Sequence, residues 1–266
     1  MKVSVIMSVY NGAKHVKASI ESILNQTYED FEFIIIDDSS KDKTLKIIEE
    51  YAKRDKRIKI LKNKFNLGLT KSLNKAIINS RGIYIARQDA DDTSLPNRLE
   101  EQIYFLNANP DYAFCGTNGK RLQTGSDILL YFGLDKIRKV LILKNCFSHP
   151  SIVIRKKILC KYGLYDENFR YSQDYELWCR LVYKYNLKCK NLNQNLIIRS
   201  IPTKRFQTNK KVFSQKLNTI RIQTKYLHFT KLTLYFFLSL ILNIIELIFI
   251  IRLASYYEKF LKKIGF

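Results

Sequence analysis

Apolar segments of strand length alternate with helical segments from residue 3 to residue 87, and this alternation leaves few folds open. The segment FEFIIID at 31–37 is too apolar to expose either face, which is typical of a parallel strand buried inside a sheet. Because short connections join each strand to the following helix, the sequence predicts an α/β fold: a doubly wound, mostly parallel sheet with helices on both faces. The predicted strands are 3–9, 31–37, 58–61 and 83–87, and the predicted helices are 14–26, 44–53 and one after the turn at 66–68.

Three of the predicted strands end in a polar loop. The loops read YNG after the first strand, DDSSKDKT after the second and QDADD after the fourth. In an open α/β sheet, ligands bind outside the carboxyl ends of the strands. We therefore expect the polar chemistry of this chain to converge on one edge of the sheet.

Three carboxylates, Asp89, Asp91 and Asp92, follow the fourth predicted strand within four residues. One aspartate would be enough for an Asx-turn or for the cap of a helix that starts near Pro96. Like charges this close raise each other's pKa unless a cation neutralises them. Because Mg²⁺ and Mn²⁺ take oxygen ligands, the cluster favours a metal site. Its charge is expected to be offset by the bound cation and not by the protein.

Three further aspartates have both a structural and a functional interpretation. Asp37 and Asp38 end the second strand, where a helix cap and contacts to a ribose or base are both expected. Asp174 begins an aromatic-rich helix at 172–185, where it is either a capping residue or a general base. No GxGxxG follows the first strand and no GxxxxGK[ST] occurs, so a dinucleotide site is disfavoured and a P-loop NTPase is excluded.

The strand–helix alternation loosens after residue 110, where strands at 151–159 and 195–201 are expected. A length of 266 residues fits one α/β domain, or one domain with an appendage. The five cysteines are odd in number and show no CxxC spacing, which predicts reduced thiols in a cytoplasmic compartment.

A net charge of +22 is compatible with three kinds of partner: nucleic acid, an anionic membrane surface and a phosphorylated small molecule. The charge is uneven, because residues 199–231 contain nine Lys or Arg and no Asp or Glu. No zinc-finger, basic-zipper or RNP-like string is present, and the basic run leads into an apolar segment, so no nucleic-acid partner is expected. The sequence carries no signal for an oligomeric state.

The apolar segment 232–251 is long enough to span a bilayer. A polar stripe runs along it and includes Glu246, which is costly in the middle of a lone spanning helix. A spanning helix, a helix lying in the membrane plane and a helix packed on the rest of the protein all fit this pattern. The basic stretch before it is expected to reinforce attachment to anionic lipids.

Six strings, taken in order, resemble the inverting family 2 glycosyltransferases, which have the GT-A fold. Each string is weak alone, but their order and spacing together are specific. The resemblance implies a catalytic domain at 1–205, with a nucleotide-sugar half at about 1–95 and an acceptor half at about 96–205, and a membrane-associating helical region at 206–266. The strings are VSVIMSVYNG, ILNQTYEDFEFIIIDDSSKDKT, NLGLTKSLNKAI, GIYIARQDADDTSLPNRLEEQ, HPSIVIRK and YSQDYELW.

The resemblance also implies a role for each site residue. Asp89 and Asp91 would hold the donor diphosphate and a divalent metal, Mg²⁺ or Mn²⁺, with Asp92 beside them. Asp174 would be the base that deprotonates the acceptor hydroxyl. The other implied residues contact substrates: Ser8 and Tyr10 line the uracil or ribose pocket, Asp38 binds the base edge, Asp37 supports that loop, Asn66 and Gly68 form the wall beside the nucleoside, and His149 lies on the acceptor side or caps a strand.

One position departs from the family pattern, because Gln173 stands where a glutamate usually precedes the catalytic aspartate. This change is expected to alter the acceptor contacts or the pKa of the base. The chain also lacks a QxxRW string, so we expect one sugar to be transferred per encounter.

The resemblance implies a nucleotide-sugar donor, with UDP the family's commonest nucleotide, and a glycan or lipid-linked acceptor. The expected setting is surface-glycan synthesis at the cytoplasmic face of the plasma membrane. Two alternatives stay open: a non-catalytic sugar-nucleotide-binding or scaffold protein of the same fold, and a nucleotidyltransferase.

Overall fold

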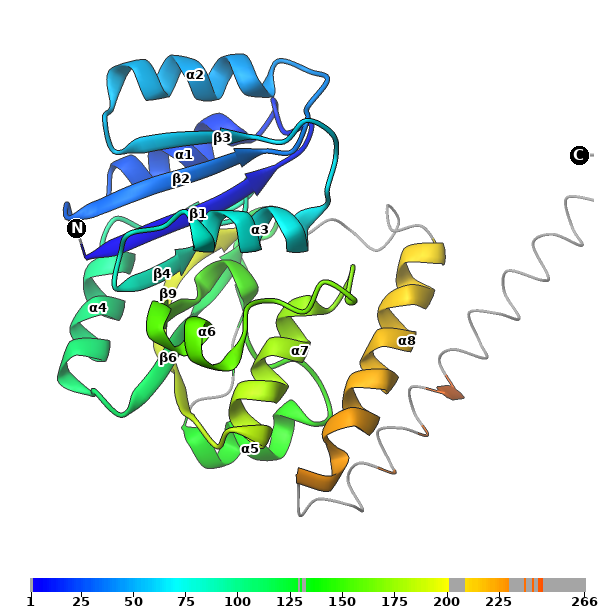
Figure 1. Cartoon of the computed structure of the whole chain (residues 1–266). Helices are drawn as coiled ribbons and strands as arrows, with labels where there is room; N and C mark the ends of the chain where they lie inside the picture. Colours follow the sequence, from blue (N-terminus) through cyan, green and yellow to red (C-terminus); the bar gives the residue numbers. More distant parts are fainter. Residues whose placement is uncertain are drawn as a thin grey trace, which may run out of the picture.

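The computed structural model describes residues 2–128, 130, 133–200 and 209–229, together with positions 237, 241, 244 and 245 (Figure 1). Within these residues, one mixed sheet has the strand order β3-β2-β1-β4-β8-β6-β9-β5, and β7 pairs with β6. The α/β class is confirmed, with helices covering both faces of the sheet.

The first half of the sheet is parallel, and every strand and helix expected in it is confirmed to within a few residues. β1 pairs with both β2 and β4, and β2 pairs with β3. Val9 and Asp37 are Cα partners, so the carboxyl ends of β1 and β2 lie side by side. The elements are β1 (Val3–Val9), α1 (Val16–Leu24), β2 (Phe31–Asp37), α2 (Thr44–Arg54), β3 (Ile58–Lys62), α3 (Leu69–Ile78) and β4 (Tyr84–Arg87).

Beyond β4 the sheet is mixed, because β8 runs antiparallel to both β4 and β6. The longest pairing in this half is the parallel one between β6 and β9. The strand expected at 151–159 is shorter than predicted, since it turns into α6 at Lys156. The strand expected at 195–201 is the end of β9. The elements are β5 (Thr93–Ser94), α4 (Arg98–Ala108), β6 (Tyr112–Arg121), β7 (Asp127–Ile128), α5 (Leu134–Leu141), β8 (Val153–Arg155), α6 (Lys156–Tyr162), α7 (Gln173–Cys179), β9 (Lys188–Arg199) and α8 (Asn209–Tyr226).

Two apolar cores lie on opposite faces of the sheet, because successive side chains of a strand alternate between its faces. Val5 and Met7 of β1 join the core beneath α1, α2 and α4. Ile6, between them, joins the other core, which α3, α5, α6 and α7 cover. The burial of β2 on both faces, expected from its sequence, is confirmed, because all of its residues are buried.

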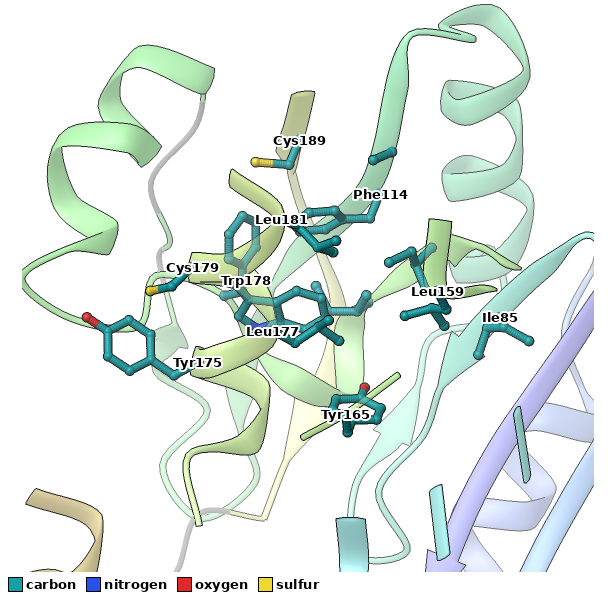
Figure 2. Close-up of a cluster of buried hydrophobic side chains, with 14 of the residues drawn as sticks. Ile85, Phe114, Leu159, Tyr165, Tyr175, Leu177, Trp178, Cys179, Leu181 and Cys189 are labelled. Atoms are coloured by element: carbon teal, nitrogen blue, oxygen red, sulfur yellow. The ribbon is translucent and has the colours of Figure 1, made fainter. Parts of the chain in front are cut away.

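The second core centres on the only tryptophan, Trp178 of α7 (Figure 2). Its ring stacks on Phe114 of β6 with 4.9 Å between centroids and an interplanar angle of 28°. After Cys179 the expected long helix continues as a π-helical turn, Arg180–Lys184. Stacked aromatic contacts of this kind add to the free energy gained from burial alone, so they fix α7 firmly against the sheet.

Helix α8 lies alongside α7 (Figure 1). The boundary predicted at 205/206 falls outside the described residues, as does most of the apolar segment 232–251. Among the residues that the structure describes, no helix combines the length and the hydropathy needed to cross a bilayer. The five cysteines are all unpaired, as expected.

Candidate active site

The acidic loop after β4 is shaped by the side chain of Gln88, which is almost fully buried. Its amide nitrogen donates to the carbonyl oxygens of Asp89 at 3.2 Å and Asp92 at 2.7 Å, and its amide oxygen accepts from Ser94 Oγ at 2.8 Å. The loop curls around this amide. Carboxylate oxygens of Asp89, Asp91 and Asp92 consequently lie within 4.8 Å of one another.

Two arginines offset part of this negative charge. Arg87, 2% exposed, forms an ion pair with Asp89. Arg199 Nε lies 3.5 Å from Asp92 Oδ2. We expected a bound cation, and not the protein, to offset the negative charge of the cluster. This expectation is wrong for Asp89 and Asp92, because each pairs with an arginine. Sequence reasoning missed both arginines, although a charged residue inside the apolar run YIAR was a signal for Arg87.

The three carboxylates differ in proton affinity. Burial opposes ionisation of Asp89, yet the Arg87 guanidinium holds the pKa of that carboxyl below its usual value. Desolvation and the charge of Asp89 raise the pKa of Asp91. The same two causes, opposed by Arg199, raise the pKa of Asp92 to about 7. Raised pKa values are what crowded carboxylates show when no cation lies among them.

The donor set fits a hard divalent cation. Carboxylate oxygens are the ligands that Mg²⁺ and Mn²⁺ prefer. Asp91 is exposed, and Asp92 Oδ2 is buried with only the 3.5 Å ion pair to Arg199 and no hydrogen bond from the described residues. The backbone N–H of Ser200, 108 residues along the chain, fixes the other oxygen of Asp92 at 2.7 Å.

The two aspartates that end β2 have different surroundings, although both are buried. Asp38 accepts three hydrogen bonds, from Asn63 Nδ2 at 2.7 Å, the Leu67 N–H at 2.8 Å and the Gly68 N–H at 2.9 Å. Asp37 accepts one, from the Ser40 N–H at 3.3 Å, and its Oδ1 has no hydrogen-bond partner within the described chain. Asp37 thus contacts the loop that follows β2 through Ser40, and Asp38 holds the separate loop before α3.

The loop that Asp38 holds leads into a cleft of about 250 Å³. Gly68 has φ +83°, a conformation that residues with a Cβ rarely adopt, and it starts α3. Thr70 Oγ1 of α3 donates to the Phe169 carbonyl at 3.1 Å, so the far wall belongs to the segment before α7. The cleft is lined by Asn66, Leu67, Gly68, Leu69, Thr70, Lys71, Glu167 and Arg170.

Ser8 and Tyr10 lie at the carboxyl end of β1, where Ser8 is half-buried and Tyr10 is 49% exposed. β1 lies between β2 and β4 in the sheet, so these residues stand between the Asp37–Asp38 pair and the acidic loop. The convergence of the three polar loops on one edge of the sheet is confirmed.

Asp174 lies in the first turn of α7 and is partly exposed, and Gln173 beside it is buried. Asn145 Nδ2 donates to Asp174 Oδ2 at 2.7 Å. The carboxylate faces a pocket of about 370 Å³ between the end of α5, the start of α7 and α8. Sequence reasoning missed Asn145, which has no motif around it.

His149 lies in the short 3₁₀ turn His149–Ser151 that precedes β8. Its Nε2 and the Tyr165 hydroxyl share a hydrogen bond of 2.8 Å. Burial, with help from the Arg87 charge, lowers the pKa of His149 to about 4, while the charges of Asp174 and Asp89 oppose the shift. The imidazole of His149 is therefore neutral at pH 7.

Comparison with known proteins matches residues 4–163 to the family described as Glycosyl transferase family 2. An uncharacterized glycosyltransferase of Methanocaldococcus jannaschii, MJ1057, is 42% identical over 195 residues, which are 70% of this chain and 67% of that protein. The O-antigen biosynthesis glycosyltransferase WbnJ of Escherichia coli is 38% identical over 200 residues, 73% of this chain and 78% of that one.

Solved structures share the fold at low identity. S. aureus TarS, residues 1–349 in complex with UDP-GlcNAc, superposes with a TM-score of 0.67 at 19% identity, over 84% of this chain and 66% of that chain. A mannosyltransferase of Pyrobaculum calidifontis, in complex with GDP-Man and Mn²⁺, reaches 0.66 at 14% identity, over 98% of this chain and 80% of that chain. The GT-A fold expected from the sequence is confirmed.

Proposed function

Because the chain belongs to the family 2 glycosyltransferases, we propose that it transfers one sugar from a nucleotide-diphosphate sugar to an acceptor hydroxyl with inversion at the anomeric carbon. The observation that carries this proposal is the cluster of Asp89, Asp91 and Asp92 after β4, whose carboxylate oxygens lie within 4.8 Å of one another. The candidate base, Asp174, lies in the first turn of α7 and accepts a hydrogen bond from Asn145.

In this proposal Asp174 takes the proton of the acceptor hydroxyl as the hydroxyl oxygen bonds to the anomeric carbon of the donor. The bond between that carbon and the diphosphate oxygen breaks on the opposite face, and the nucleotide diphosphate leaves with the electron pair. A divalent cation held by Asp89, Asp91 and Asp92 would supply stabilisation of the charge on the leaving group. Asn145 orients the base through its 2.7 Å hydrogen bond.

The nucleoside end of the donor is proposed to lie at the ends of β1 and β2. Ser8, Tyr10, Asp37 and Asp38 line this edge, and Asn66 and Gly68 belong to the adjoining cleft. Asp37 Oδ1, which has no hydrogen-bond partner among the described residues, is proposed to accept a hydrogen bond from the base or the ribose. UDP is the proposed nucleotide, supported by the UDP-GlcNAc complex of a protein with the same fold.

The acceptor side is assigned to His149, Gln173 and Asp174. A glycan or lipid-linked acceptor in surface-glycan synthesis is proposed from the likeness to WbnJ. The proposed location is the cytoplasmic face of the plasma membrane, with the basic and apolar C-terminal region in contact with anionic lipids. Support comes from the four described positions within 232–251, which are helical and expose apolar side chains: Phe237, Ile241, Ile244 and Ile245.

The proposal is tested with the purified full chain and a panel of UDP-, GDP-, dTDP- and CMP-sugars, each with Mn²⁺, Mg²⁺ or EDTA. We expect metal-dependent binding and slow hydrolysis of one nucleotide class, UDP. NMR of the transfer product gives the anomeric configuration, which is inverted relative to the donor. Failure to bind any nucleotide sugar, in detergent and with lipid present, contradicts the proposal.

A non-catalytic sugar-nucleotide-binding protein is the second candidate, and Gln173 is the observation that favours it. The Asp174→Asn variant separates the two candidates. An enzyme loses transfer and keeps donor binding, whereas a binding protein shows no transfer before or after the change.

A further inference from the structure

A cavity that is separate from the candidate active site lies between helix α4 and strand β9. Its volume of about 600 Å³ is within the range of small-molecule sites and exceeds those of the clefts at Gly68 and Asp174. One wall is a single face of α4, since its lining residues are separated by three, one and three positions. The opposite face of the helix is buried in the core. The lining residues of α4 are Glu101, Tyr104, Phe105 and Ala108, and the core residues are Leu99, Ile103 and Leu106.

The facing wall is shaped by a bulge in β9. Two adjacent residues of β6, Thr117 and Asn118, have Cα partners in β9 that are three positions apart. Asn193 and Gln194 are the two extra residues of β9, and both are exposed and line the cavity. Bulges redirect side chains and are common next to functional sites. This bulge turns two amide side chains toward α4.

The two bulged amides keep hydrogen-bonding capacity for a ligand. Gln194 Nε2 donates to Glu101 Oε2 at 3.2 Å, and Asn193 Oδ1 accepts from Asn118 Nδ2 at 3.4 Å. An amide side chain carries both N–H donors and an acceptor oxygen. Within the described residues, Asn193 Nδ2 and Gln194 Oε1 form no hydrogen bond. The wall therefore offers one donor group and one acceptor group side by side.

The aromatic residues of the cavity differ in how they are held. The Phe105 ring contacts Tyr112 edge to face at 5.1 Å between centroids, and Lys190 Nζ lies 5.4 Å from its centroid. Tyr104, by contrast, is 74% exposed. A tyrosine ring has apolar faces and a polar hydroxyl. Because a sugar ring has apolar C–H faces and a rim of hydroxyls, a free tyrosine beside two amides is suited to a saccharide.

The cavity is electrically neutral in a chain with a net charge of +22. Among the described residues that line it, Glu101 and Lys190 are the only charged ones, and their charges cancel. Glu101 is bonded to Gln194, and Lys190 lies against Phe105. An anionic ligand would be attracted to the basic surfaces elsewhere and not to this lining. A neutral, hydroxyl-rich ligand matches it.

This part of β9 is also an edge of the sheet, which raises a competing occupant. Within the described residues, β5 pairs only with Ile197 and Ile198 of β9, further along the strand. An open edge can accept a strand from another chain, including a second copy of this one. The bulge at 193–194 interrupts the ladder at the point where such a strand would pair. Because bulges at edges oppose strand addition, the saccharide is favoured.

We propose that this cavity binds a neutral oligosaccharide, with one sugar ring stacked on Tyr104 and its hydroxyls bonded to Asn193 and Gln194. The inference goes beyond the proposed function and does not depend on it, because none of these residues belongs to the candidate active site.

Strand β9 connects the cavity to the acidic loop. From Gln194 it runs roughly 16 Å to Arg199, which pairs with Asp92. An oligosaccharide held in the cavity is thus kept near the candidate active site without occupying it.

The test titrates the purified full chain, without nucleotide and in a detergent that has no sugar headgroup, with maltohexaose, cellohexaose and N-acetylchitohexaose. Calorimetry measures affinity, and saturation-transfer NMR shows which sugar protons contact the protein. We expect at least one of the three hexaoses to bind. Tyr104→Ala should weaken that binding about tenfold, or about 1.4 kcal/mol, because truncation of a central aromatic side chain is among the costliest changes in a binding site. Gln194→Ala should weaken it less, and Tyr104→Phe, which keeps the ring, should retain most of it.

Phe65→Ala is the matched control, because Phe65 is an aromatic residue of similar exposure, 66%, that lies outside the cavity. The melting temperature of each variant is measured first. Binding of none of the three hexaoses, or equal binding by the parent and Tyr104→Ala, overturns the inference. Displacement of the hexaose by UDP with Mn²⁺ would place it in the candidate active site and also overturn the inference. A chain that binds a hexaose but no UDP contradicts the proposed function and leaves this inference in place.

The competing occupant is tested by sedimentation of the parent and of Tyr104→Ala. We expect the same molecular mass for both. A parent dimer that Tyr104→Ala converts to a monomer would show that a second copy of the chain covers the cavity, and the saccharide assignment would then be wrong.

Discussion

The parallel and mixed halves of the sheet contribute to the site in different ways. In the parallel half, Asp37, Asp38 and Asp89 stand where they do because β2 and β4 end there, next to β1. In the mixed half, Asp174 lies on a seven-residue helix whose position depends on Asn145, the Trp178 core and α8. Topology therefore fixes the proposed donor side, and contacts between distant segments fix the proposed acceptor side.

The largest effect that this comparison predicts is on the donor side. Asp91→Ala should abolish metal-dependent UDP binding and lower transfer by about a thousandfold, because stabilisation of the leaving group contributes several kcal/mol. Removal of the metal with EDTA should have the same effect on the parent protein. Since Asp91 is exposed, the melting temperature should barely change. Asp111→Ala, at an exposed ion pair with Lys188, is the control and should keep full activity.

On the acceptor side, Asp174→Asn should lower kcat by about 10²–10⁴, the usual contribution of a general base. Binding of UDP and Mn²⁺ should be unaltered, because the acidic loop and Asp174 belong to different halves. Single-turnover kinetics with saturating donor measures the first effect, and calorimetry the second. A parallel loss of UDP binding would show that the two halves do not act independently.

Within the donor half, substitutions of the two neighbouring aspartates should have different effects. Replacement of Asp38 should mainly lower stability, and replacement of Asp37 should mainly weaken UDP binding. Asp38→Ala removes the acceptor of three hydrogen bonds and should lower the free energy of unfolding by about 3 kcal/mol, since such bonds to a charged group are worth about 1.5–3 kcal/mol each before relaxation. Asp37→Asn should cost less stability and weaken UDP binding more. Urea unfolding and UDP titration of both variants check this, and equal stability losses would contradict it.

The acid sensitivity of the fold should depend on His149. Its pKa is lowered from 6.5 to about 4 in the folded state, so the unfolded chain binds the proton more readily between these pH values. This contribution to stability is present above pH 6.5 and declines as the pH falls toward 4, by about 2 kcal/mol at pH 5. In urea unfolding experiments, the His149→Gln variant should lose less stability between pH 7 and pH 5 than the parent protein does. An identical loss in both would rule out His149 as the cause.

The smallest predicted effect concerns the hydrogen bond that anchors α8 to α7. Tyr226→Phe removes the 2.6 Å hydrogen bond to Glu176 and leaves Lys225 in place, which should cost about 1–2 kcal/mol. Transfer should fall slightly, and the fall should appear in the KM of the acceptor and not in that of the donor. An effect confined to the KM of the donor would contradict this prediction, because it would mean that α8 supports the donor side and not the acceptor side.

The sequence predicts the parallel half of the sheet better than the mixed half. In the parallel half, apolar runs such as FEFIIID and the loops that follow them predict both the strands and the positions of Asp37, Asp89 and Asp91. Arg199 and Ser200 were not predictable as partners of Asp92, because only the completed β9 brings them there. Asn145 and Glu176 belong to the same class: each acts through a contact with a distant segment that no local pattern announces.

The pairing of β6 with β9 has a consequence for how the chain folds during synthesis. β6 (Tyr112–Arg121) finds its parallel neighbour only in Lys188–Arg199, so this ladder closes after nearly two hundred residues have left the ribosome. The strands β1 to β4 are complete at Arg87 and can begin to pack much earlier. Contacts so far apart in sequence form slowly. A nascent chain therefore carries an early-formed parallel half and, for a time, an exposed edge at β4 that only the arrival of β8 covers.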